Sequence, residues 1–320
     1  MNAAIAALRS DRALQRQAQA ATDAACRAWR EDPAARVAME DLEAYGNGAQ
    51  LADCAALATM LTDPHRGRQL VGSLMDLLCR AMKAEPFAHP PFRHGFDGTS
   101  GTLLLARSGR AQLLLQTREP GRVPLSSVTF SDAERRDMVL AGSGHGLLIR
   151  LSGEQAGTAR LDSGLFDLVP DITLALDLSR ECLLVEEAHT RLVVLRLLRA
   201  APSPGPVREY DLANGRLLGH SAGHLSSSHR ENMMALLAAM DRRDAAPVMA
   251  GVALAPGEDS LRWQAIRECL AMDTGTGFDL LCRVAHDEGD PLAGQAGALR
   301  AQLVEAHPQL LEWEKNRCPA

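Results

Sequence analysis

The sequence predicts an α+β protein in which two helical regions flank a central region of antiparallel strands. Apolar residues recur at helical spacing in the first 86 residues and again after residue 227, whereas the residues between them form ten or more short apolar runs separated by turn residues. At 320 residues, 46% of them hydrophobic and 23% charged, the chain can bury a sizeable core. We therefore predict three domains, over residues 1–86, 87–226 and 227–320.

The N-terminal region is predicted to be helical throughout. An Ala-rich helix ends near Asp32-Pro33, and further helices are expected around residues 35–44, 49–62 and 65–84. Asp63-Pro64 marks the start of the last helix, because an Asp side chain caps free backbone N–H groups and a proline suits the first helical position. Three prolines within residues 86–92 end the region, since proline cannot continue a helix.

The central strands are predicted to form an antiparallel sandwich or barrel. One hairpin is expected around Ser108-Gly109 and another around Asn214-Gly215, where the Asn-Gly pair favours a type I′ turn. Val193, Leu195 and Leu197 share one face of a further run, which is typical of a central strand buried in a sandwich. The run from Asp132 to Asp137 is mixed in charge and is expected to be a solvated turn.

Residues 164–177, GLFDLVPDITLALD, resemble the Gly-rich turn in the second half of cupins, with Asp171 where that family has a glycine. The family's first motif, two histidines two apart followed by a glutamate, is absent, because HGLLIRLSGE offers only His145 and Glu154. The positions at which this sequence differs from the cupin motif are those of the family's metal ligands. The resemblance therefore implies a cupin-like architecture for the central domain and no particular metal site.

The C-terminal region is predicted to be helical, with a capping box of Ser228 and Glu231 at its first helix. Further helices are expected near residues 259–272, 276–287 and 291–306. The stretch from residue 261 onward resembles HEAT-type repeats, on residues Arg262, Ala265, Ile266 and Leu270 of one helix and Phe278, Leu281 and Val284 of the next. This resemblance implies packing or partner binding rather than catalysis.

Two clusters of polar residues are the first candidates for a site. In FAHPPFRHGFDGTSG, a turn rich in Pro and Gly can direct several polar side chains into one pocket. The alternative interpretation is that this segment is a structured linker without a binding function. In GHSAGHLSSSH, two histidines would share a helix face and bind a metal, but the surrounding glycines and serines favour a loop. The candidate ligand-binding residues are Arg93, His94, Asp97 and His145. The candidate metal ligands are His89, His94, His220 and His224.

A third set follows one of the predicted strands. Glu186 and Glu187, with His189 and Arg191, have the residue types of an acid/base set, although alternation along a strand would expose half of them. His189 would meet His89, His94 or His145 only through tertiary folding.

Two function classes remain open. The first is a non-enzymatic ligand-sensing or protein-binding regulatory protein, for which no cofactor is predicted. The second is a metal-dependent cupin-type enzyme, an oxygenase or isomerase, which implies Fe, Mn, Ni or Zn. The absence of paired histidines and of phosphate-loop, nucleophile-elbow and kinase motifs favours the first class.

Charge sets the expected partners. Forty acidic against 34 basic residues give a net charge of −6, and 14 acidic against 9 basic residues between 227 and 320 give −5 in that region. An acidic helical surface repels nucleic acid and favours a protein partner.

No apolar run reaches the roughly 18 residues of a membrane span. Charges interrupt the N-terminal stretch, so we expect a cytoplasmic protein without nucleic-acid or membrane partners.

Overall fold

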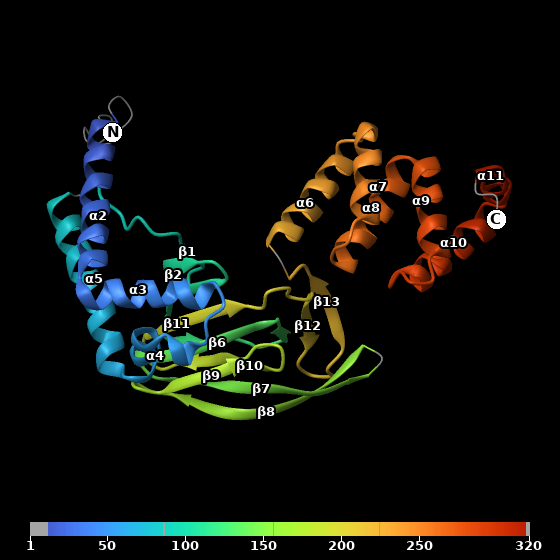
Figure 1. The fold of residues 1–320 in the computed structure, drawn as a ribbon. Helices are drawn as coiled ribbons and strands as arrows, with labels where there is room; N and C mark the ends of the chain where they lie inside the picture. Colours follow the sequence, from blue (N-terminus) through green and yellow to red (C-terminus); the bar gives the residue numbers. More distant parts are fainter. Residues whose placement is uncertain (1–11, 86, 156, 224, 318–320) are drawn as a thin grey trace. The chain divides into compact units, whose positions relative to one another are not determined.

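The computed structural model describes residues 12–317 apart from residues 86, 156 and 224, and Figure 1 shows its elements. The chain divides into two compact units, Met1–Pro202 with Glu209–Leu218, and Ser203–Arg208 with Gly219–Ala320. The described helices of the first unit are α2 (Ala13–Glu31), α3 (Pro33–Gly46), α4 (Ala55–Thr62) and α5 (Pro64–Ala84).

Two Asp-Pro pairs start helices of the first unit, as the sequence indicates. The Asp63 carboxylate accepts hydrogen bonds from the backbone N–H groups of His65 and Arg66 at the start of α5, at 2.9 and 3.4 Å. Asp32 does the same for two N–H groups at the start of α3, at 3.0 and 3.2 Å. Each carboxylate thus satisfies N–H groups that have no partner within the helix.

The strands form three sheets, the two larger of which have antiparallel pairs, and this confirms the predicted α+β class. The largest sheet has the order β1 (His94–Phe96), β2 (Ser100–Ser108), β3 (Ala111–Arg118), β11 (Leu192–Ala200), β6 (Ala133–Ala141), β9 (Thr173–Asp177). The second has the order β4 (Gly121–Arg122), β10 (Glu181–Ala188), β7 (Gly144–Gln155), β8 (Thr158–Leu168). The third has the order β13 (Leu217–Ser221), β12 (Val207–Asp211), β5 (Ser127–Phe130).

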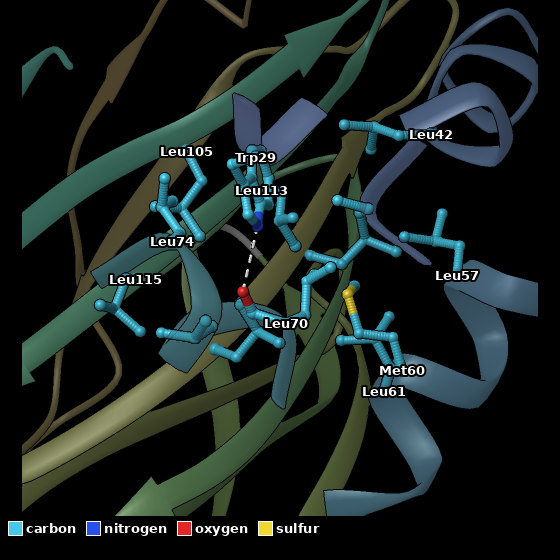
Figure 2. Packing of buried hydrophobic residues seen from close by; sticks show 14 of the residues in the cluster. Trp29, Leu42, Leu57, Met60, Leu61, Leu70, Leu74, Leu105, Leu113 and Leu115 are labelled. Atoms are coloured by element: carbon cyan, nitrogen blue, oxygen red, sulfur yellow. Dashed lines mark hydrogen bonds between the residues drawn. The ribbon is translucent and has the colours of Figure 1, made fainter. Parts of the chain in front are cut away.

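The N-terminal helices pack on one face of the six-stranded sheet. Leu195 and Leu197 of β11 are buried there with Trp29 of α2 and Leu70 of α5. The indole N–H of Trp29 donates to the Leu70 carbonyl oxygen at 3.2 Å, as Figure 2 shows. Residues 12–85 and the strands therefore lie in one compact unit rather than on either side of a boundary, because each apolar face needs the other as its partner.

The opposite faces of the sheets enclose two further clusters. Between the six-stranded and four-stranded sheets lie Val139, Leu168, Leu183 and other apolar side chains. The outer face of the four-stranded sheet contributes Ile149 and other residues to a cluster with Phe130 of β5 and Tyr210 of β12. The four-stranded sheet thus has an inner face toward the six-stranded sheet and an outer face, part of which β5 and β12 cover.

The second unit is helical and has its own core. Its helices are α6 (Leu225–Ala239), α7 (Ala246–Leu254), α8 (Asp259–Met272), α9 (Thr274–His286), α10 (Ala293–Ala306) and α11 (Gln309–Arg317). Apolar residues between Met234 and Ala296 form the core, with Ala265, Ile266, Cys269 and Leu281 fully buried. Helices are present where the sequence predicts them, while the HEAT-type repeat stays a prediction. In the described residues no helix is long and apolar enough to cross a membrane.

Four local predictions are wrong in detail. Ser228 lies inside α6 rather than capping it, because the helix starts at Leu225. Helix α9 starts at Thr274 rather than at residue 276, and the Asp273 side chain caps it by accepting a hydrogen bond from the N–H of Thr276. The hairpin at Asn214-Gly215 exists, but only Gly215 has a positive φ (71°), so the turn is not type I′. The run from Asp132 to Asp137 enters strand β6 instead of forming a solvated turn.

Candidate functional site: a cavity between the sheets and a histidine cluster outside them

The space between the six-stranded and four-stranded sheets contains a cavity of about 210 Å³. One part of its wall is apolar and includes Val139, Phe166, Leu168, Leu183, Val185 and Val194. The other part is polar and includes Ser100, Thr102, Gln116, Arg118, Asp137 and Arg196. Strand alternation explains the arrangement, since every second residue of β2, β3, β6 and β11 points away from the N-terminal helices.

A buried ion-pair group contributes Asp137 and Arg196 to the polar part of the cavity wall. The Arg196 guanidinium donates through Nε and Nη2 to the two carboxylate oxygens of Asp137, both at 2.7 Å. Arg135 lies two residues before Asp137 on β6, and its Nε is 3.2 Å from the same carboxylate. Within the described residues the buried Nε and Nη2 of Arg135 have no hydrogen-bond partner, and burial lowers the pKa of this guanidinium. Two buried cations therefore share one carboxylate.

Arg118 adds a second guanidinium to the cavity lining, beside that of Arg196. Its Nη1 donates to the Ser100 hydroxyl at 2.5 Å, and it forms no ion pair with a carboxylate in the described part of the chain. Among the lining residues the charged ones are Arg118, Asp137 and Arg196, which leaves a net charge of +1. The cavity thus combines an apolar wall with donors suited to an anion.

The cavity does not fit the transition metal that a cupin-type enzyme would use. Among the described residues that line it there is no histidine, cysteine or glutamate. Its one carboxylate, Asp137, is already engaged by Arg196 and Arg135. Imidazole and thiolate are the ligands that Fe, Ni and Zn favour, so the residues present here supply no ligand set for such an ion.

A separate cluster lies on the outer face of the four-stranded sheet. His145 of β7, Glu187 of β10 and His189, just beyond β10, have potential ligand atoms that all lie within 4.8 Å of one another. The His145 and His189 ring centroids are 5.3 Å apart. Nε2 of His145 is 3.9 Å from a carboxylate oxygen of Glu187 and 3.9 Å from one of Glu186.

The structure places the other predicted site residues apart from this cluster. His89, His94 and His220 are exposed and belong to no group of three potential metal ligands among the described residues. His94 Nδ1 lies 2.9 Å from the Phe92 carbonyl oxygen. His220 lies in β13 rather than in the expected loop, and His224 falls outside the described residues.

Two further predicted residues have structural partners. The Asp97 carboxylate accepts hydrogen bonds from the N–H groups of Ser100 and Thr99 and from the Thr99 hydroxyl. These bonds, that from Ser100 first, hold the pKa of Asp97 below its ordinary value. The Arg93 carbonyl oxygen accepts from Leu104 N–H at 3.0 Å, and the Arg93 side chain is exposed.

Sequence reasoning missed the cavity residues and found only part of the outer cluster. Arg135 and Asp137 belong to the charged run interpreted as a turn; the signal for a strand was the alternation that continues into the apolar residues after it. The sequence pattern places Glu187 and His189 with Arg191, but the Arg191 guanidinium binds Glu119 at 3.0 and 3.1 Å. His145, predicted as a ligand-binding residue elsewhere, is the partner that tertiary folding supplies.

Comparison with known proteins gives only a distant likeness. No family model matches the chain, and no curated protein matches it. A cupin superfamily protein from Desulfitobacterium hafniense DCB-2 shares 15% identity over 33% of this chain and 83% of its own, with a TM-score of 0.24. HutD from Pseudomonas fluorescens SBW25 shares 14% identity over 34% of this chain and 56% of its own, with a TM-score of 0.24.

A vicilin from Capsicum annuum shares 20% identity with this chain, and the match covers 38% of this chain and 33% of the vicilin, with a TM-score of 0.27. A cupin superfamily structure is thus among the matches. Likeness at this level carries no information on activity, ligand or partner, which must come from the chain's own residues.

Proposed function

We propose that the cavity between the two sheets binds a small organic acid and that the protein is a non-enzymatic ligand-sensing protein. The observation that carries this proposal is the charge of the cavity. Its lining has the guanidiniums of Arg118 and Arg196 but the carboxylate of Asp137 alone. A planar guanidinium binds a carboxylate through two parallel hydrogen bonds, so a second carboxylate, that of the ligand, suits this end of the cavity.

Burial strengthens the case for an anionic ligand. Arg135 and Arg196 are both largely removed from water, and Asp137 balances only one of them. A buried charge without a partner is costly, and a bound anion offsets that cost in the low-dielectric interior. Ligand binding and stability of the sandwich are therefore expected to be coupled.

The size of the cavity limits the ligand. Drug-sized molecules occupy pockets of about 300–1,000 Å³, whereas this cavity measures about 210 Å³. Valine, leucine and phenylalanine side chains form the apolar part of the cavity wall. A monocarboxylic acid with a short aliphatic or single aromatic body matches both the volume and the wall.

The lining residues favour this function over the metal-dependent enzyme, because they provide neither a metal ligand set nor an unengaged carboxylate or imidazole to transfer a proton. The expected protein partner of the acidic C-terminal helices stays a prediction.

Thermal unfolding of the full-length protein tests the proposal. Sodium hexanoate and sodium benzoate are the probes, and hexanamide and benzamide are neutral controls of similar shape. We expect the acids to raise the melting temperature in a concentration-dependent way, as a ligand that binds only the folded state does, and the amides to leave it unchanged.

The variant Arg118→Gln keeps a polar side chain and removes one guanidinium from the cavity. We expect its affinity for the acids to fall by about tenfold, which corresponds to about 1.4 kcal/mol. Arg150→Gln is the matched control, because Arg150 is exposed and pairs with Glu181 away from the cavity lining. Acids without effect on the wild-type melting temperature, or equal effects on Arg118→Gln and wild type, would refute the proposal.

A further inference from the structure

A β-bulge brings two consecutive carboxylates beside one imidazole. Residues 186 and 187 of a regular strand would point to opposite faces of the sheet. The register of β10 against β7 shifts between Val185 and Glu187, and Glu187 then pairs directly with His145. As a result, Glu186 and Glu187 each have a carboxylate oxygen 3.9 Å from His145 Nε2. Bulges of this kind often re-aim side chains at functional sites.

The two glutamates differ in their partners. Arg122 of β4 holds Glu186 through a hydrogen bond of 2.5 Å between Nη2 and Oε1. The Glu187 carboxylate accepts no hydrogen bond within the described chain, and it is 38% exposed. Of the two carboxylates, that of Glu187 is therefore the one available to bind a ligand.

The turn after β10 fixes His189 next to this pair. The N–H groups of His189 and Thr190 donate to the Ser143 carbonyl oxygen at 2.8 and 3.2 Å. In return, the N–H of Ser143 donates to the Thr190 hydroxyl at 2.9 Å. Gly142, with φ 86°, lets the chain approach Arg191 so closely that a Cβ would clash with its carbonyl oxygen. The backbone that carries His189 is thus held by several contacts.

We propose that His145, Glu187 and His189 bind a divalent transition-metal ion with the preferences of Zn²⁺. Two imidazoles and one carboxylate form a ligand set that zinc adopts when a fourth position stays open to water. Ligand atoms of a tetrahedral zinc site with bonds of about 2.0–2.1 Å are about 3.4 Å apart. The His145–Glu187 distance of 3.9 Å therefore needs only small side-chain rotations.

The local charge also favours a cation. Glu186 and Glu187 lie beside His145, and Asp167 of β8 is the cross-strand partner of His145 on its other side. Arg122 balances one of these three carboxylates. His145 is 24% exposed, so that an ion can enter from solvent without opening the sandwich. The site lies on the opposite face of the sheet from the cavity, and it depends on neither the acid ligand nor the sensing role.

Isothermal titration of untagged, EDTA-treated full-length protein with ZnCl₂ tests this site. We expect one equivalent of Zn²⁺ per chain. Because loss of even an outer-shell partner weakens metal binding by about 10–100-fold, we expect His189→Ala and Glu187→Gln each to raise the Kd at least about tenfold. Both side chains lie at the surface, so circular dichroism of the metal-free variants should match that of the wild type.

Two variants serve as matched controls. His94→Ala removes an exposed histidine of β1, and Cys79→Ser removes an exposed thiol that could bind zinc by itself. We expect both to leave the Kd unchanged. Absence of stoichiometric binding by the wild type, or binding that survives in the double variant His189→Ala/Glu187→Gln, would overturn the proposal. The effect of hexanoate on the melting temperature should persist in that double variant, which separates this site from the cavity.

Discussion

Arg262 joins three helices of the C-terminal unit through one side chain. Its Nε donates to the Ala253 carbonyl oxygen of α7 at 2.8 Å, and its Nη1 donates to Asp290, which precedes α10, at 3.1 Å. Asp290 also accepts from Leu292 N–H at 2.9 Å. The Arg262 hydrogen bond first, then that of Leu292, holds the pKa of Asp290 below its ordinary value. Both side chains of the pair are 10% exposed.

The Asp290→Asn substitution should destabilise the C-terminal unit in a pH-dependent way. At neutral pH we expect a loss of about 3 kcal/mol, the lower end for breaking a buried ion pair. A carboxylate with a lowered folded-state pKa contributes stability above its unfolded pKa of about 3.9, and the contribution is lost as pH falls through the lower folded value. The difference between wild type and variant should therefore shrink below about pH 4.

Urea unfolding at pH 7 and at several pH values below 4 measures this difference. Asp259→Asn is the control, because Asp259 is 52% exposed and lies 3.7 Å from the same guanidinium. A variant as stable as the wild type at pH 7, or a difference that grows as the pH falls, would contradict the assigned role of Asp290.

At the level of elements, strand β11 determines the packing of the first unit. Leu195 is fully buried and lies between Leu115 of β3 and Met138 of β6 in the sheet register. Its neighbour Arg196 points to the opposite face and binds Asp137 beside the cavity. One strand therefore supplies both the core that holds the helices and the guanidinium of the proposed ligand site.

Leu195→Asp should unfold the first unit. The variant loses about 1.5–3 kcal/mol of side-chain burial and adds the desolvation cost of an unpaired carboxylate, against a total stability of about 5–15 kcal/mol for a domain. Leu165→Asp, at a position of β8 that is 70% exposed, is the matched control and should melt like the wild type, as should His220→Ala at an exposed position of β13. Thermal melts of the three variants measure these effects. A Leu195→Asp variant that melted like the wild type would disprove the assignment of Leu195 to a buried central strand.

At the scale of the whole molecule, the chain has separate hydrophobic cores in its two compact units. The C-terminal core draws its residues from Met234 to Ala296, and among the residues that the structure describes none of the first unit belongs to it. Units with separate cores open independently in hydrogen exchange. We therefore expect the two units to unfold independently, each when the contacts within its own core are lost.

Hydrogen exchange of the Leu195→Asp variant tests this independence. We expect amides of β3, β6 and β11 to lose protection, while those of α8 and α9 keep the protection they have in the wild type. Simultaneous loss of protection in both sets would mean that the two units unfold as one.

The sequence by itself determined the class of the fold, the helix starts at Asp32 and Asp63, and the buried face of β11, because capping and periodicity act between residues close in the chain. It did not predict that the helices within residues 12–85 share a core with the strands, since an apolar face does not specify its partner.

The candidate sites depended on tertiary structure for the same reason. Arg118, Asp137 and Arg196 come from three strands and meet only when the sheets close around the cavity. Glu187 and His189 are near each other in sequence, but their relation to His145 depends on a bulge and on the pairing of β10 with β7. A one-residue shift in register exchanges the faces of a strand, and long-range pairing rather than local preference sets that register.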